Sequence, residues 1–196
     1  MNPGELLERS LAYALGSVAV VPRDGLRWPT PCAAWDLGEL LHHLDDSVDA
    51  LYEGVADGRV GLGPSPPAAD PVCAFRERAG ALLGAWAAMS AARPAPAVGD
   101  RCMDPGLLAA VGALEIAVHG WDVARACGQG RPIPSALAAE LLPVAYMVVA
   151  DADRGVRFAD PVDVPVRTGP GGVLLAFLGR RPQPRFLFGA GPVRLP

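Results

Sequence analysis

The stretch PGLLAAVGALEIAVHGWDVARA, residues 105–126, decides the fold class of this chain. Before Arg125, its only ionisable side chains are Glu115, His119 and Asp122, and all its other residues but one tryptophan are aliphatic or small. A helix that is apolar nearly all round is typically buried by other elements. The stretch therefore predicts a central helix that other helices must cover.

The ends of this central helix also carry sequence signals. Asp104 and Pro105 suit its start, because aspartate is a favoured N-cap residue and proline is favoured at the first helical position. Gly128 suits the position just past its C-terminal end. Gly112 and Gly120 have no side chains, so they permit close contact with neighbouring helices.

Three further long helices precede the central helix in the chain. Their apolar residues recur at helical spacing, and each run begins at a capping residue. A shorter fifth helix should follow, with a bend at Pro143. The expected ranges are Asn2-Pro3 as far as Pro22, 36–55, 70 to about 91, and about 134–151. Four long helices joined by loops predict an all-α four-helix bundle.

The C-terminal part of the chain differs from the rest. Residues 156–167 are predicted to be extended at best, and residues 173–178 to form a short helical turn. A strand is expected at residues 185–188 in the tail. We therefore divide the chain into a helical bundle over 1–155 and a partly extended appendage over 156–196.

The composition argues against several classes of protein. The 196-residue chain is 51% hydrophobic and 19% charged, which is typical of a folded domain and not of a disordered chain. Its net charge of −4 argues against a nucleic-acid-binding protein. We expect neither a signal peptide nor a membrane span, because Gly, Pro or charged residues interrupt every apolar run. Four scattered cysteines without a CxxC pair favour the reducing cytoplasm.

Three polar residues of the central helix are candidates for chemistry. At about 100° per residue, Glu115, His119 and Asp122 fall within a sector of roughly 60°. A buried carboxylate is costly unless it is paired or bound to a metal, and Glu and His four residues apart can hold one ion. The same pattern fits a hydrogen-bonded pair that orients the helix. Asp122 also fits a surface ion pair with Arg125.

The preceding helix offers two histidines as a third ligand. His42 lies on an acidic flank with Asp46, which indicates a solvated face, whereas His43 shares its flank with Leu40 and indicates the rim of the core. His43 is the better inward candidate, although it also fits an edge histidine that covers apolar surface. One Glu and two His would form a site with open positions for water or substrate, as a catalytic metal requires. Zinc, non-haem iron and nickel all suit such ligands.

Three segments of this chain resemble motifs of a known family. TPCAAWDLGELLHHL, residues 30–44, is similar to the T-P-C-x-x-W-[TD]-V-x-D-L-L-x-H-L segment of the DinB-like, mycothiol-dependent maleylpyruvate isomerase N-terminal family. EIAVHGWDVARA, residues 115–126, is similar to its E-x-x-x-H-x-W-D-L-A-x-A signature. LLAFLGR, residues 174–180, resembles a third signature. The resemblance covers about residues 5–182.

The resemblance implies a DinB-like four-helix bundle with one divalent metal in its core. By motif position the ligands are His43, Glu115 and His119, and Asp122 either supports them or anchors the end of the helix. Zinc is the first expectation, with nickel or iron as alternatives. We expect Cys32 to pack in its loop and not to act in catalysis, because none of its sequence neighbours would activate it.

The chemistry of the family is thiol chemistry. The metal would hold a low-molecular-weight thiol, mycothiol, as the thiolate that attacks an electrophilic carbon. The resemblance thus implies a metal-dependent thiol transferase or isomerase that acts on a small electrophilic metabolite, with His43, Glu115 and His119 as catalytic residues. All 17 basic residues are arginine, which indicates a high-GC genome such as that of an actinobacterium.

Two other functions remain open from the sequence. The first is a thiol-independent biosynthetic enzyme (a cyclase, isomerase or hydrolase) that uses Glu115 or His119 as acid or base. The second is a non-catalytic ligand-binding or resistance protein. In each case the expected partner is a small molecule and not a nucleic acid or a membrane, and the chain could form a homodimer.

Overall fold

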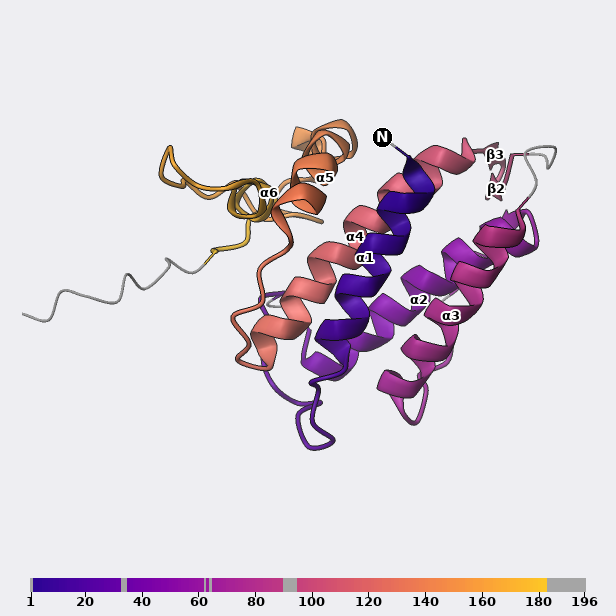
Figure 1. Cartoon of the computed structure of the whole chain (residues 1–196), viewed down its shortest axis with the longest axis horizontal. Coiled ribbons are helices and arrows are strands. Elements are labelled where there is room, and N and C mark those ends of the chain that lie inside the picture. The colour runs from indigo at the N-terminus through magenta and orange to yellow at the C-terminus, as the bar shows by residue number, and fades with distance from the viewer. Residues whose placement is uncertain (1, 33–34, 62, 64, 90–94, 183–196) are drawn as a thin grey trace, which may run out of the picture.

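The fold is a helical bundle with a C-terminal appendage (Figure 1). The computed structural model describes residues 2–32, 35–61, 63, 65–89 and 95–182. Four long helices form the bundle, and a fifth packs on it and carries a sixth. These are α1 (Pro3–Val18), α2 (Leu37–Ala56), α3 (Pro71–Ala88), α4 (Pro105–Ala126), α5 (Ser135–Val148) and α6 (Pro170–Phe177). The prediction of an all-α bundle is confirmed.

The long helices begin at the capping residues expected from the sequence. The side chains of Asn2, Asp70 and Asp104 each accept a hydrogen bond from a backbone N–H in the first turn. Asp36 and Glu39 form a reciprocal pair at the start of α2, with N···O distances of 2.9 and 2.8 Å. These caps satisfy backbone donors that have no partner inside the helix, and so they fix where each helix starts.

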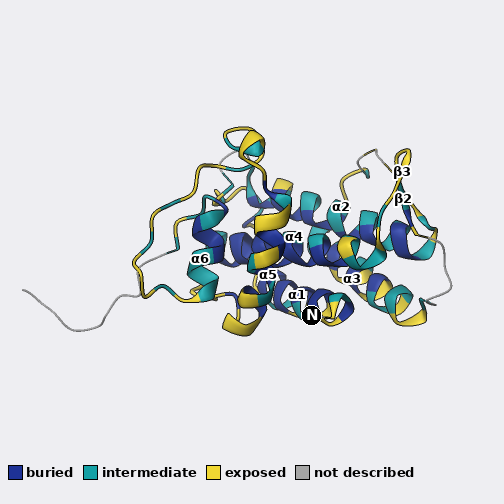
Figure 2. Cartoon of the chain, turned by 90° about the horizontal axis from the view of Figure 1, so that it is seen from above, coloured by how far each residue is buried: buried dark blue, intermediate teal, exposed yellow. Residues whose placement is uncertain are grey.

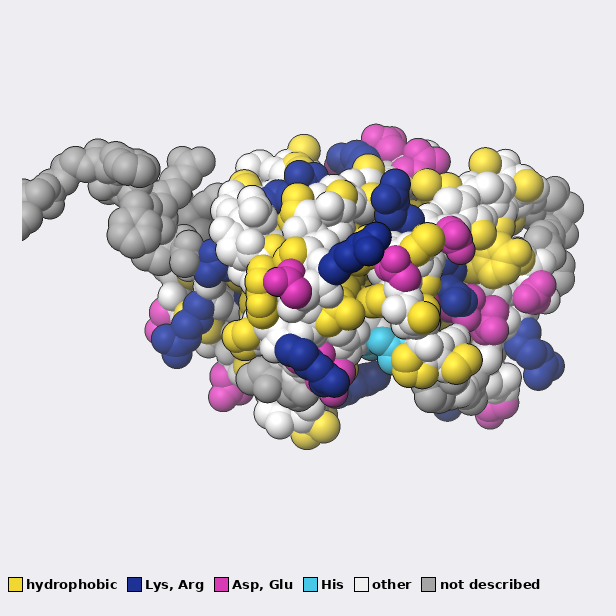
Figure 3. Space-filling model, turned by 90° about the horizontal axis from the view of Figure 1, so that it is seen from below, with side chains coloured by type: hydrophobic (Ala, Val, Ile, Leu, Met, Phe, Trp, Pro, Cys, Tyr) yellow, Lys and Arg dark blue, Asp and Glu magenta, His cyan; other side chains and the backbone are white. Residues whose placement is uncertain are grey.

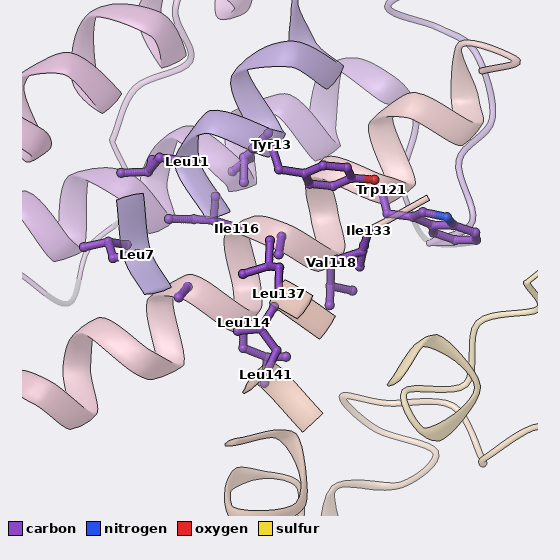
Figure 4. Packing of buried hydrophobic residues seen from close by; sticks show 14 of the residues in the cluster. Leu7, Leu11, Tyr13, Leu114, Ile116, Val118, Trp121, Ile133, Leu137 and Leu141 are labelled. Atoms are coloured by element: carbon purple, nitrogen blue, oxygen red, sulfur yellow. The ribbon is translucent and has the colours of Figure 1, made fainter. Parts of the chain in front are cut away.

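Helix α4 is the centre of the bundle, as its sequence predicts. It is buried along most of its length and contacts α1, α2 and α5 (Figure 2). Apolar side chains of α4 pack together with those of α1 and α5 (Figure 4). A β-carbon on Gly120 would lie 3.0 Å from the Cα atom of Ala14 in α1, so this glycine is what allows the two helices to approach. A β-carbon on Gly112 would likewise overlap the side chain of Leu51 in α2.

The apolar character of α4 follows from this central place. By length and composition it is long and apolar enough to cross a membrane. However, 78% of its most apolar window is buried inside the protein, and the core helix of a globular domain passes the same test.

A small sheet lies where the sequence predicts only loops. Strand β2 (Ala97–Val98) pairs in parallel with β1 (Arg59–Val60) and antiparallel with β3 (Arg101–Cys102). Each strand has two residues, which is too short to show the alternation of polar and apolar residues that identifies a strand. The sheet connects the ends of α2 and α3 to the start of α4.

The appendage is only partly regular. Helix α5 ends at Val148, earlier than predicted, and a short 3₁₀ turn η1 (Asp151–Asp153) follows. Pro143 lies inside α5. Residues 156–167 contain neither helix nor strand among the described residues, and α6 packs against α5. The strand expected at 185–188 lies outside the described residues, and the division of the chain at residue 155 stays a prediction.

Candidate metal centre

Helices α2 and α4 bring three of the predicted residues together. The Nε2 atom of His43 lies 2.7 Å from Oε1 of Glu115, and the Nε2 atom of His119 lies 3.1 Å from the same oxygen. Glu115 and His119 are one turn apart on α4, and the cap of α2 sets the position of His43 opposite them. One carboxylate oxygen therefore lies between two imidazole nitrogens.

This group, which we call the ligand group (His43, Glu115 and His119), is open on one side. The side chains of His43 and Glu115 are 33% and 37% exposed, whereas that of His119 is 7% exposed. A small molecule can therefore approach the nitrogen and oxygen atoms of the group from solvent. Figure 3 shows one face of the molecule, on which basic, acidic and apolar side chains are mixed.

The other side of the His119 ring is closed. Its Nδ1 atom lies 3.0 Å from Oδ2 of Asp122, and the Arg180 guanidinium donates to the same oxygen at 2.8 Å. The Asp122 side chain has no exposed surface, and that of Arg180 is 11% exposed. This contact fixes the orientation of the His119 ring, so that its Nε2 atom faces Glu115.

The surface ion pair between Asp122 and Arg125 is therefore wrong as an interpretation of Asp122. Asp122 points into the protein and binds Arg180, whereas the Arg125 guanidinium lies over the Trp121 ring, 5.7 Å from its centre. The two residues are neighbours on α4, but the packing of α4 places them in different environments.

Cys32 lies next to the same arginine. Its Sγ atom is 3.4 Å from Nη2 of Arg180 and 3.7 Å from Oδ2 of Asp122. Cys32, His119 and Asp122 form a second set of atoms close enough to hold a metal, but the Arg180 cation already stands against it and disfavours a further cation. The expectation that Cys32 only packs in its loop is therefore incomplete, because its thiol belongs to the polar contacts behind His119.

Sequence reasoning missed two residues of the site. Arg180 lies 58 positions after Asp122, and nothing in the sequence links them. Trp35 places its ring 4.5 Å from that of His43 and 6.0 Å from that of His119. Both residues stand in segments that resemble family motifs, and that resemblance was the one available signal.

The neighbouring histidine of α2 does not join the group. The Nε2 atom of His42 lies 3.6 Å from Oδ2 of Asp46 in the next turn of the helix. It also lines a surface cavity between the start of α2 and residues 67–71, away from the ligand group. His42 is therefore a matched reference for experiments on His43.

The contacts around His119 shift the pKa values of the two neighbouring carboxylates and of the imidazole in opposite directions. Burial opposes the charged form of Glu115, but the charge of His119 and hydrogen bonds with both histidines hold its pKa well below the usual range. Burial likewise opposes protonation of His119, but Glu115 and Asp122 raise its pKa well above the usual range. Burial opposes ionisation of Asp122, but His119 and Arg180 lower its pKa. These contacts therefore keep the carboxylates of both Glu115 and Asp122 charged.

The ligand group fits a divalent cation. Its three ligand atoms all lie within 4.8 Å of one another, and two imidazole nitrogens with one carboxylate oxygen are ligands that zinc accepts. Donors bound to one zinc ion lie about 3–3.5 Å apart, given bonds of about 2.0–2.2 Å. The His119–Glu115 distance of 3.1 Å lies within this spacing, whereas the His43–Glu115 distance of 2.7 Å is that of a direct hydrogen bond, which would lengthen around a bound cation. Without a cation, the Nε2–H groups of His43 and His119 can each donate a hydrogen bond to the same Glu115 oxygen.

Comparisons with known proteins agree with the motifs. The family model described as the mycothiol maleylpyruvate isomerase N-terminal domain matches residues 7–124. The chain is also 31% identical over 189 residues to an uncharacterized protein found in two strains of Mycobacterium tuberculosis, covering 92% of this chain and 98% of each relative. No solved structure matches. The chain belongs to the mycothiol maleylpyruvate isomerase N-terminal domain family.

Proposed function

We propose that this protein is a metal-dependent thiol transferase or isomerase that acts on a small electrophilic metabolite in the cytoplasm. One observation carries the proposal: His43, Glu115 and His119 direct two nitrogens and one oxygen to one point at the open side of the site. Three protein ligands leave further positions for exogenous molecules, which is typical of a catalytic and not of a structural zinc site. Membership of the family supports thiol chemistry.

Each residue has a defined task in this proposal. His43, Glu115 and His119 would bind the cation, which when bound would keep a thiol deprotonated. Asp122 and Arg180 hold the His119 ring, and their buried contacts keep water from that side. In the transferase, the thiolate would attack an electrophilic carbon, so that a C–S bond forms while the bond from that carbon to a leaving group breaks. In the isomerase, the thiolate would add to a conjugated double bond and push its electron pair along the conjugated system. After rotation about the resulting single bond, that pair would return, the C–S bond would break, and the thiolate would leave the isomer.

The cofactor and partners follow from the same argument. We propose zinc as the metal, with nickel or iron as alternatives that the same ligands accept. Mycothiol is the proposed thiol, because the family is named for it. The other partner is a small molecule with an electrophilic carbon.

A second candidate function rests on the contacts of His119. Glu115, His119 and Asp122 form a carboxylate–imidazole–carboxylate series with distances of 3.1 and 3.0 Å. Such a series can accept and donate a proton at Nε2 of His119. In this case the protein would be an isomerase, cyclase or hydrolase that requires no thiol.

Metal content tests the first proposal directly. We expect about one equivalent of metal in the wild-type protein, purified without chelator or metal-affinity resin and measured by elemental analysis. His43→Ala and His119→Ala should each lose it, whereas His42→Ala should keep it, because His42 lies outside the ligand group. Wild-type protein that binds no metal even after metal is added would contradict the proposal.

Thiol dependence separates the two candidate functions. Turnover of α,β-unsaturated acids and other small electrophiles would be measured with the metal-loaded protein, with and without mycothiol. Turnover that requires the thiol supports the transferase or isomerase. Turnover without any thiol, lost in Glu115→Gln, supports acid–base catalysis instead.

A further inference from the structure

Trp35 lies against both histidines of the ligand group. Its ring is 4.5 Å from the ring of His43, at an interplanar angle of 35°, and 6.0 Å from the ring of His119, at 50°. The two imidazoles are 5.0 Å apart and nearly perpendicular. The indole therefore closes one side of the His43 ring, whose Nε2 atom meets Glu115 at its edge.

Hydrogen bonds to the backbone fix the position of Trp35. The Thr30 hydroxyl lies 2.9 Å from the carbonyl oxygen of Cys32 and 2.8 Å from that of Trp35, so its one proton is shared between two acceptors. The backbone N–H of Trp35 also donates to the Cys32 carbonyl at 2.9 Å. Trp35 directly precedes Asp36, the N-cap of α2. The indole is thus attached to the start of the same helix that carries His43.

We propose that Trp35 is a positioning residue, held by Thr30, that orients the His43 imidazole so that its Nε2 atom points at Glu115 and at a bound cation. His43 needs this support because its side chain is one-third exposed and, among the described residues, none forms a hydrogen bond with its other ring nitrogen. His119 has Asp122 for this purpose. The inference rests on the proposed function only in taking His43 as a metal ligand.

NMR of the metal-free protein tests the contact without reference to metal or activity. The chain has three histidines, so three sets of imidazole signals are expected, and His43→Ala assigns the relevant set. In the wild type, the indole ring current should shift the His43 signals away from their random-coil positions. Trp35→Leu should abolish this shift and change the nitrogen signals of His43, whereas Trp35→Phe should keep most of both. Trp28→Leu, at an exposed tryptophan, is the matched control.

Metal affinity tests the functional part of the inference. Replacing a residue that orients a metal ligand weakens metal binding about 10–100-fold, and we expect this range for Trp35→Leu by competition with a chromophoric chelator. Trp35→Phe should recover near wild-type affinity. Thr30→Val should weaken binding in the same direction, and Thr30→Ser should restore it, because serine keeps the hydroxyl.

The outcomes separate this inference from the proposed function. Wild-type protein that binds no metal would overturn the proposed function, and the His43 signals would still decide the role of Trp35. Unchanged His43 signals and unchanged affinity in Trp35→Leu would overturn the inference. If Trp35→Leu does not fold by circular dichroism, Thr30→Val decides: His43 signals and affinity equal to the wild type would overturn the inference, and changes reversed by Thr30→Ser would support it.

Discussion

The two sides of the His119 ring have opposite characters. At Nδ1, the buried carboxylate of Asp122 is neutralised by Arg180, and the Cys32 thiol lies against both. At Nε2, Glu115 lies between two histidines. Its side chain is about one-third exposed, and no arginine of the described residues lies within ion-pair distance of it. One side carries its own permanent cation, whereas the other relies on imidazoles, which carry a charge only when they are protonated.

This difference shows which contacts are structural and which are available for chemistry. A guanidinium is always charged, so the Asp122–Arg180 pair is complete at any physiological pH and needs nothing from solution. The negative charge of Glu115 is balanced only when His43 or His119 is protonated. Under the proposed function, a divalent cation would take the place of those protons. The Nδ1 side would then contribute to stability and the Nε2 side to ligand binding.

The largest expected effect comes from a substitution on the Nδ1 side of His119. Asp122→Asn leaves the guanidinium of Arg180, which is 11% exposed, without its counter-charge. We expect the free energy of unfolding to fall by about 3–5 kcal/mol, as when one partner of a buried ion pair is removed. Urea unfolding measures this, with the exposed Asp163→Asn as a control near the wild type. A loss below about 1 kcal/mol would show that the pair is not structural.

The next effect belongs to the Nε2 side. At free metal 100-fold above its dissociation constant, the wild-type protein should gain about 2.7 kcal/mol in free energy of unfolding, and a chelator should remove that gain. Glu115→Gln should lose the gain, because it removes the carboxylate oxygen of the ligand group. Equal metal stabilisation of Glu115→Gln and the wild type would contradict the assignment of Glu115. His42→Ala should respond as the wild type does.

The pH dependence of stability sharpens the comparison further. The pKa of Glu115 is lowered, so its contribution is present above its ordinary value of 4.5 and is lost as pH falls through the folded-state pKa. The pKa of His119 is raised, so its contribution is present below its ordinary value of 6.5 and is lost as pH rises through the folded-state pKa. Without metal, the free energy of unfolding of the wild type should therefore exceed that of Glu115→Gln most between pH 4.5 and 6.5. A pH-independent difference between them would show that the pair is not coupled.

The smallest effect concerns the start of α2, which places His43. Asp36→Ala removes the side-chain acceptor for the Glu39 N–H and should cost about 1 kcal/mol by thermal unfolding. The Glu39 backbone hydrogen bond lowers the pKa of Asp36, so the loss should be present above pH 3.8 and should disappear as pH falls through the lowered value. Asp36→Asn, which keeps an acceptor, should cost less. A loss that persists unchanged at low pH would argue against capping by the carboxylate.

Much of the bundle could be predicted because its signals are local. The caps at Asp36, Asp70 and Asp104 and the nearly uncharged α4 each depend on residues within one or two turns of each other. The two-residue strands and the early end of α5 were missed, because neither leaves a periodic pattern.

The residues of the candidate site likewise fall into those that local spacing in the sequence predicts and those that it does not. Residues three and four positions apart on a helix share a face, so the sequence determined by itself that Glu115, His119 and Asp122 lie together on a buried helix. It also determined, through the motif, that His43 is the histidine to consider. Only the tertiary structure decided that Asp122 binds Arg180, that Cys32 joins them and that Trp35 lies against His43. The Cys32 and Arg180 contacts to Asp122 join positions 90 and 58 residues apart, and the packing of whole helices, not any local period, sets such distances.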